Sequence, residues 1–240
     1  MTITDIGTVP ADPSLGEAVL DDPVWASLTG PHRQFSERVG GAARYQTDVA
    51  PFVALADHRD PQNWRDAATL VGPSGTFAIA GTGIVPPAGW TAQESLEGVQ
   101  LVDVSLVKEH DPEAIRLSAA DVPEILDLVE RTQPGPFRPR TIELGTYLGI
   151  RRNGALVAMA GERLHPPGWT EISAVCTDPA YRGQGLATRL VSAVGAGIAD
   201  RGDRVLLHAA ARNVTAIRLY LANGFQLRRR TTFSSVQAPA

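Results

Sequence analysis

An apolar stretch, a glycine-containing corner and a helical pattern follow one another without a break in residues 170–199. Thr170–Thr177 is rich in apolar and β-branched residues and predicts a buried strand. The apolar spacing over Gln184–Ala199 predicts a helix that packs one face against a sheet. Gly183 and Gly185 lie between them, so backbone N–H groups can approach an anion closely, beside the positive end of the helix dipole. This unit predicts a strand, an anion-binding corner and a helix in direct succession.

Two other interpretations of this corner compete with a pyrophosphate site. A pair of glycines before a helix can be a plain turn that binds nothing. A dinucleotide-binding unit would need a third glycine and an acidic residue at a strand end about 20 positions further on. The third glycine is missing, and Asp200 and Asp203 fall in the turn after the helix. The dinucleotide interpretation is therefore the weaker one.

Composition narrows the classes of protein. Of the 240 residues, 43% are hydrophobic and 20% are charged, as in ordinary globular proteins, and the formal charge of −4 argues against nucleic-acid binding. The single cysteine, Cys176, excludes an intrachain disulfide, and the spacing of the five histidines predicts no metal site. The first residues lack a signal-peptide pattern, and no apolar run is long enough to span a membrane. We expect a cytoplasmic protein without a membrane or nucleic-acid partner.

A charged break at 108–112 divides the chain into two halves. Residues 1–14 are expected to form a flexible arm, 15–110 an amino-terminal α/β half and 111–240 a carboxy-terminal half. The first half is expected to hold helices at 22–28 and 61–71 and strands at 52–56, 75–81 and 98–107. The second half is expected to hold strands at 114–118, 147–151, 155–162, 170–177, 205–211 and 225–233, and helices at 121–132, 184–199 and 214–222. Asp121, with Glu124 as its capping-box partner, is expected to begin the first of these helices.

A second motif lies at 211–225. Asn213 is a suitable N-cap, and Gly224 is a suitable left-handed C-cap, for a helix between them. Tyr220 falls near the end of the inward face of this helix, where its hydroxyl can point at a cleft. A tyrosine in such a position is, taken alone, more commonly a core aromatic residue with a polar tip.

Together the two motifs resemble the GNAT superfamily, the acyl-CoA-dependent N-acetyltransferases. The residues that carry the resemblance, after the strand EISAVCTDP, are Arg182, Gly185, Ala187, Asn213, Tyr220, Gly224 and Phe225. The resemblance covers the carboxy-terminal half. It implies an α+β fold with a mixed, splayed sheet flanked by helices, in which the amino-terminal half is a divergent GNAT-like partner. It also implies acetyl-CoA as the acyl donor.

The resemblance implies a role for each matching position. The pantetheine arm of acetyl-CoA would lie along strand 170–177 and hydrogen-bond to the backbone of Val175 and Thr177, on either side of Cys176. Asn213 would contact the cofactor near the pantetheine, and Tyr220 would be the catalytic acid for the departing thiolate. The pyrophosphate would be held by the residues of the corner, which are Arg182, Gly183, Gln184, Gly185, Leu186, Ala187 and Thr188.

The general base is left open by these motifs. Glu171 lies on the strand beside the cofactor, and the alternation of a strand places it on the same face as Ser173 and Val175. Glu143 and Glu162 are alternatives, and a bound water could replace all three. For Glu171, a solvated carboxylate at the end of a strand is an equally good interpretation.

Three further features are tempting as functional sites. Cys176 is expected on the opposite face from Glu171 and away from a helix N-terminus, which favours a small buried residue over a nucleophile. Arg228–Arg230 is expected on a solvated edge of the last strand rather than in a nucleic-acid site. Phe137, with Arg138 or Arg140, is expected to line an acceptor pocket, because the loop lies where acceptor loops occur in the family it resembles.

The function expected from these observations is transfer of an acetyl group from acetyl-CoA to a primary amine. The amine would attack the thioester directly, with the oxyanion held by a backbone N–H group. The alternative is a non-catalytic acyl-CoA-binding or interaction module. The acceptor, whether a small molecule or a protein, and the oligomeric state, including a homodimer, stay open.

Overall fold

The computed structural model describes residues 16–240, so the arm expected at 1–14 lies outside the described residues. The helices are α1 (Pro23–Thr29), α2 (Pro61–Val71), α3 (Val122–Thr132), α4 (Leu186–Asp200) and α5 (Val214–Ala222). The strands are β1 (Ser36–Val39), β2 (Ala42–Tyr45), β3 (Val53–Leu55), β4 (Thr76–Gly81), β5 (Thr91–Asp103), β6 (Ile115–Arg116), β7 (Tyr147–Arg152), β8 (Ala155–Glu162), β9 (Trp169–Thr177), β10 (Arg204–Ala210) and β11 (Phe225–Gln237).

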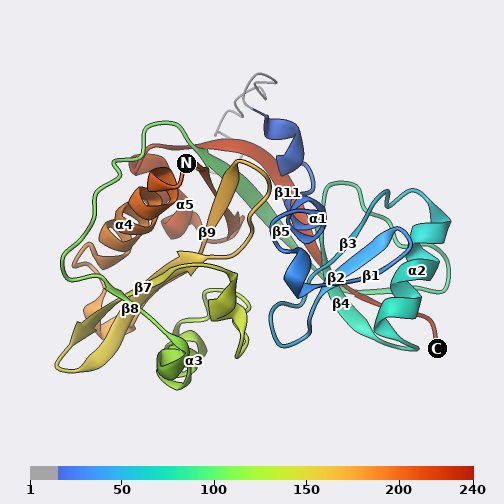
Figure 1. Cartoon of the computed structure of the whole chain (residues 1–240), viewed down its shortest axis with the longest axis horizontal. Helices are drawn as coiled ribbons and strands as arrows, with labels where there is room; N and C mark the ends of the chain where they lie inside the picture. Colours follow the sequence, from blue (N-terminus) through green and yellow to red (C-terminus); the bar gives the residue numbers. More distant parts are fainter. Residues whose placement is uncertain (1–15) are drawn as a thin grey trace.

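These strands form two sheets. The smaller sheet has three antiparallel strands in the order β1-β2-β3. The larger has eight strands in the order β4-β11-β5-β10-β9-β8-β7-β6, and β9 and β10 are its parallel pair. Helices flank this mixed sheet (Figure 1). The α+β class expected from the sequence is confirmed.

The larger sheet takes strands from both sides of residue 110. β5 lies between β10 and β11, and β4 pairs with the outer side of β11. β5 and β11 are long strands of 13 residues each, and they run from one lobe of the molecule to the other (Figure 1). The strand expected at 98–107 is therefore part of β5, which begins at Thr91, and the strand expected at 225–233 is part of β11, which continues to Gln237. Arg228 is only 8% exposed and is ion-paired with Glu17, so the solvated position expected for it is wrong, whereas Arg230 is exposed.

The two faces of the large sheet are covered separately. Leu190 and Val194 of α4 pack with Ala158 of β8 on one face. Ile125 of α3 packs with Met159 of β8 on the other. Because residues of one strand contribute to both clusters, the clusters lie on opposite faces of the sheet. We call them the α4 face and the α3 face.

The second lobe is built from α1, α2 and the three-stranded sheet. Asp22 and Asp60 cap the starts of α1 and α2 by accepting hydrogen bonds from Trp25 N and Gln62 N, and a proline follows each cap. Strands β1 and β2 were not expected from the sequence. They are four residues each, and the outward positions of β1 are polar, so neither gives a periodic apolar signal.

The capping prediction for α3 is correct in position and wrong in its contacts, because Asp121 is the N-cap residue of α3 but makes no side-chain hydrogen bond to the first turn of that helix. Asp121 accepts from Ser118 N at 2.8 Å and caps the preceding short turn. Glu124 does not close a capping box with Asp121, because its carboxylate accepts from Leu156 N of β8 at 2.6 Å. Glu124 therefore joins α3 to the sheet.

Within residues 16–240, none of the helices combines the length and apolar character needed to cross a membrane.

Candidate active site

The parallel strands β9 and β10 open a gap in the sheet. Their pairing ends at Ile172 and Leu207, although β9 continues to Thr177 and β10 to Ala210. The last part of β9 is paired with β8 on one side only. Its backbone groups on the other side face the gap, where an extended ligand chain can bind as an added strand. This gap confirms the splayed sheet expected from the sequence.

A bulge in β9 decides which side chains face which way. Ala174 has a φ of 53°, in the left-handed region that residues with a Cβ seldom adopt, and the register with β8 shifts beside it. Val175 consequently packs on the α4 face together with Ile172, whereas Cys176 packs on the α3 face. The alternation expected for Glu171, Val175 and Cys176 is therefore wrong, because the bulge adds one residue to the strand.

The glycine corner leads from β9 into α4. Gly183 and Gly185 have φ values of 78° and 73°, and a Cβ at either would meet no atom within 4 Å. Gly185 is the N-cap of α4 and provides no side-chain cap, so the first-turn N–H groups stay available. Arg182 and Gln184 are exposed on the same corner. The corner thus offers backbone donors and the positive end of a 15-residue helix to an anion.

The remaining residues expected at the pyrophosphate differ in exposure. Leu186 is only 2% exposed and packs in the core on the α4 face. Ala187 and Thr188 are half-buried in the first turn of α4. Their contribution to a ligand would therefore come from backbone N–H groups and from the Thr188 hydroxyl.

α5 carries the other expected site residues. Asn213 is its N-cap and accepts a hydrogen bond from Ala216 N at 3.1 Å. Tyr220 is 7% exposed and packs edge-on against Phe225, with 6.0 Å between ring centroids. Burial and the neighbouring Cys176 raise the pKa of Tyr220 to about 12. The phenol therefore stays protonated at neutral pH and can donate a proton or a hydrogen bond.

Cys176 has the properties of a buried structural thiol. It is 7% exposed, and burial raises its pKa to about 11. A thiol in this state is a weak nucleophile.

Glu171 is fully buried and has two partners. Arg163 donates to both of its oxygens, at 2.6 and 2.8 Å, and His208 Nδ1 lies 2.7 Å from Oε1. Burial alone would raise the pKa of Glu171, but the Arg163 guanidinium and these hydrogen bonds outweigh it and lower the pKa to about 2. Its carboxylate is ionised and enclosed by protein groups.

The two alternative bases are also ion-paired. Glu162 is 2% exposed and accepts from Arg201 Nη2 at 2.8 Å. Glu143 is exposed and pairs with Arg140, which holds the pKa of that carboxyl below its usual value. All three candidate carboxylates are thus engaged with arginine.

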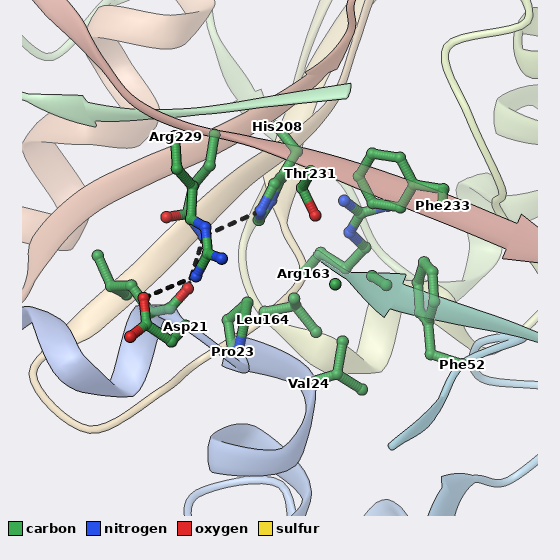
Figure 2. Close-up of a pocket in the computed structure, with 14 residues that line it drawn as sticks. Asp21, Pro23, Val24, Phe52, Arg163, Leu164, His208, Arg229, Thr231 and Phe233 are labelled. Atoms are coloured by element: carbon green, nitrogen blue, oxygen red, sulfur yellow. Dashed lines mark hydrogen bonds and ion pairs between the residues drawn. The ribbon is translucent and has the colours of Figure 1, made fainter. Parts of the chain in front are cut away.

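A pocket lies on the α3 face of β10, β5 and β11, where α1 approaches the sheet (Figure 2). It encloses about 380 Å³ of atom-free space, part of it open to solvent. Phe52, Phe233 and Val24 form apolar walls, and His208 and Arg163 contribute nitrogen atoms (Figure 2). Both halves of the chain therefore build this pocket.

His208 was missed as a site residue in the sequence. Histidines were weighed there only as metal ligands, and among residues 16–240 no three His, Cys, Asp or Glu side chains come together as a metal site. The available signal was a single polar residue within the apolar strand VLLHAAA. Its partners come from β9 and β5, which local sequence cannot reveal.

The expected acceptor loop is fastened to the second lobe. Phe137 is buried edge-on against Tyr147, with ring centroids 5.4 Å apart. Arg138 Nη1 donates to Thr47 O, and Arg140 Nη1 donates to the Gln46 carbonyl oxygen Oε1 at 2.7 Å. Arg138 and Arg140 therefore join the loop to the second lobe, Phe137 packs in the core on the α3 face, and the pocket described above is lined by other residues.

Three comparisons place the chain among known proteins. The sequence model of the FR47-like protein family matches residues 147–234. A GNAT-family protein from Novosphingobium aromaticivorans is 36% identical, with a TM-score of 0.84, over 92% of this chain and 99% of that one. A GCN5-related N-acetyltransferase from Kribbella flavida shares the fold at 18% identity, with a TM-score of 0.58 over 91% and 95% of the two chains.

Among curated proteins, the N-alpha-acetyltransferase RimI of Mycobacterium tuberculosis is 41% identical over 92 residues. That match covers 35% of this chain and 56% of RimI, so it spans about half of the relative's length. The near-complete overlap with the Novosphingobium protein, at 36% identity, extends over both lobes. The chain belongs to the GNAT superfamily.

Proposed function

We propose that this chain transfers an acetyl group from acetyl-CoA to a primary amine. The observation that carries the proposal is the exposed glycine corner of α4, placed directly after the open edge of β9. A ligand with an extended amide-containing arm and a pyrophosphate, as acyl-CoA has, matches an open strand edge followed by an anion site. Membership of the GNAT superfamily supports acyl-CoA as the donor.

The residues of the corner fit the pyrophosphate sterically. The space around the Cβ positions of Gly183 and Gly185 is empty to 4 Å, so a phosphate group can approach the backbone there. Val175 and Thr177 would pair with the pantetheine arm through their backbone groups, next to Cys176. The corner residues Arg182 to Thr188 and the N-cap Asn213 would contact the remainder of the ligand.

Tyr220 is the proposed acid. Its pKa of about 12 keeps the hydroxyl protonated throughout the neutral range, and the residue lies beside Cys176 at the open part of β9. When the amine attacks the thioester carbon, the C–S bond breaks and the CoA thiolate needs a proton. Tyr220 can supply it, and a backbone N–H of β9 can hold the oxyanion of the intermediate.

The acceptor is proposed only as a class. RimI is an N-alpha-acetyltransferase, so peptides with a free α-amino group belong in an acceptor screen together with free amino acids and small amines. The alternative is a non-catalytic acyl-CoA-binding module. Such a module would bind acyl-CoA at the same site as the proposed enzyme but would not transfer the acyl group to an amine.

Calorimetric titration with acetyl-CoA, free CoA and a longer acyl-CoA tests the donor. We expect micromolar binding of acetyl-CoA, followed by release of free CoA when a suitable amine is added, measured with a thiol reagent. Binding without turnover of any amine would favour the non-catalytic module. Failure to bind all three CoA compounds would show that the corner is only a turn.

A further inference from the structure

A cleft lies in the second lobe, between the start of α2 and the loop that follows β4. Its cavity volume is about 330 Å³, whereas that of the pocket at His208 is only about 10 Å³. Clefts that bind small molecules typically have volumes of about 300 Å³ or more, and a cavity of 10 Å³ holds about one water molecule. The cleft beside α2 therefore has room for an organic ligand.

This cleft is remote from the glycine corner. α2 lies at one end of the molecule and α4 at the other, with the long strands β5 and β11 between them (Figure 1). The residues that line the cleft come from 58–64 and 82–87, and none of them belongs to the proposed acetyl-CoA site. A molecule bound here would be a second ligand of the chain.

The polar part of the cleft carries nitrogen groups without partners. His58 and Arg59 line it, and within residues 16–240 neither side chain makes a hydrogen bond or an ion pair. Thr82 adds a hydroxyl that is held in place, since it donates to Arg230 O at 3.1 Å and accepts from Arg229 Nη2 at 2.9 Å. A guanidinium without a partner favours a carboxylate, which its planar fork can bind through two hydrogen bonds.

Two carboxylates lie close to Arg59 in sequence, and both bind backbone groups instead. Asp57 Oδ1 accepts from Arg59 N at 2.9 Å. Asp60 Oδ1 accepts from Gln62 N at 2.8 Å, as the N-cap of α2. Neither aspartate lines the cleft, and no other acidic residue from the described part of the chain does. The Arg59 guanidinium is thus available to an anion in the cleft.

Most of the remaining lining is apolar. Pro61 and Pro87 restrict the backbone of the two segments that form the walls, so the cleft keeps its shape without a ligand. Val85 is 76% exposed at the cleft, where a ligand would cover it. Trp64 is 2% exposed, so only a small part of its ring reaches the cleft. These walls match a ligand with an apolar body.

We propose that this cleft binds a small carboxylate with an apolar body, in which Arg59 holds the carboxylate and Val85 and Pro87 cover the body. The second lobe thereby has a ligand-binding role of its own. The inference goes beyond the proposed acetyl transfer and does not depend on it, because no step of that reaction involves a residue of the cleft.

The test uses 3-phenylpropionate and its neutral counterpart, 3-phenylpropanamide, with the full chain. The two compounds share the same apolar body, and only the first is charged at neutral pH. We expect 3-phenylpropionate to bind with a dissociation constant in the millimolar range. The affinity for the amide should be lower by about fivefold or more, because it lacks the charge-assisted hydrogen bonds. Sodium chloride at equal concentration is the control for ionic strength.

The indole N–H resonances of the four tryptophans report where the probe binds. Trp64 Nε1 donates to His58 O at 2.8 Å, and Trp90 packs edge-on against Trp64, with 5.0 Å between ring centroids. Trp25 belongs to α1 and Trp169 to β9. In assigned proton–nitrogen correlation spectra, we expect 3-phenylpropionate to shift the Trp64 and Trp90 resonances and to leave those of Trp25 and Trp169 in place.

Three variants separate the two parts of the proposed site. Arg59→Gln should lower the affinity for 3-phenylpropionate about fivefold or more and leave that for the amide unchanged. Val85→Ser should weaken both compounds alike, because it removes apolar contact area. Arg65→Gln is the matched control, since Arg65 is also exposed, lies on α2 and is outside the cleft lining. It should leave both affinities unchanged.

Two kinds of result would overturn the proposal. Absence of shifts at Trp64 and Trp90, or equal shifts at all four tryptophans, would show that the cleft is not the binding site. Equal affinities for the acid and the amide, or an unchanged affinity for the acid in Arg59→Gln, would show that the cleft does not select a carboxylate. Because none of these measurements uses CoA, their result is independent of the acetyl-CoA titration.

Discussion

At the scale of single residues, burial and pairing set the chemistry of each candidate. Tyr220 and Cys176 are neighbours that burial keeps protonated, so one can serve as an acid and the other cannot serve as a nucleophile. The pKa of Glu171 is lowered instead of raised, because the Arg163 guanidinium outweighs the effect of burial, and the carboxylate is ionised. The resemblance to the GNAT superfamily singled out Tyr220 as the proposed acid, whereas the ionised state of the Glu171 carboxylate depends on Arg163, eight positions away in sequence.

The variant Tyr220→Phe removes the proposed proton donor while keeping the ring. We expect kcat to fall by about tenfold or more, and acetyl-CoA affinity by calorimetry to stay nearly unchanged, because the hydroxyl acts on the departing thiolate. Tyr147→Phe is the control: Tyr147 is also buried, and its hydroxyl has no hydrogen-bond partner within residues 16–240. Equal kcat values for wild type and Tyr220→Phe would show that Tyr220 is not the acid.

At the scale of elements, the β9–corner–α4 unit combines three local devices. The bulge at Ala174 turns Val175 toward the α4 face, the gap beside β10 exposes the strand edge, and the glycines leave the helix N-terminus uncovered. The helix and the glycine corner follow local patterns and were predicted. The bulge was not, because alanine has no preference for a positive φ and adopts it here only under the constraint of the sheet.

Gly185→Ala tests the corner, with Gly202→Ala as a matched control beyond the other end of α4. Both glycines have positive φ, 73° and 85°, and open space around Cβ, so alanine should cost about 1 kcal/mol of stability at either. Only the Cβ at 185 would project into the proposed pyrophosphate site. We expect acetyl-CoA affinity to fall about tenfold or more in Gly185→Ala and to stay unchanged in Gly202→Ala. Equal affinities in the two variants would place the pyrophosphate elsewhere.

At the scale of the whole molecule, buried polar contacts join the two lobes. His32, which is 3% exposed, hydrogen-bonds to the Tyr45 hydroxyl at 2.8 Å and packs on His165, with ring centroids 4.8 Å apart. Burial, followed by the influence of His165, lowers the pKa of His32 to about 3. The contact between the lobes is therefore made by neutral histidines.

Acid should weaken this contact. The unfolded chain protonates His32 near pH 6.5, whereas the folded chain does so only near pH 3, so stability is full above pH 6.5 and is lost as pH falls toward 3. Between pH 6.5 and 5.5 this one group should remove about 1 kcal/mol of the free energy of unfolding. In urea titrations, His32→Gln should lose less stability over that interval, and the exposed His110→Gln should behave as wild type. An unchanged pH dependence in His32→Gln would contradict this origin.

The amino-acid sequence by itself determined the strand, corner and helix of 170–199, the α5 motif with Tyr220, and most helix positions, because periodicity, glycine and capping act within a few residues. Only the tertiary structure decided that β5 enters the sheet between β10 and β11, that Arg228 is buried, and that Glu171 faces His208. These outcomes depend on pairing between residues far apart in sequence, up to 146 positions for Thr91 of β5 with Gln237 of β11. The free energy of such pairing comes from hydrogen bonds and buried surface that exist only once both lobes are assembled.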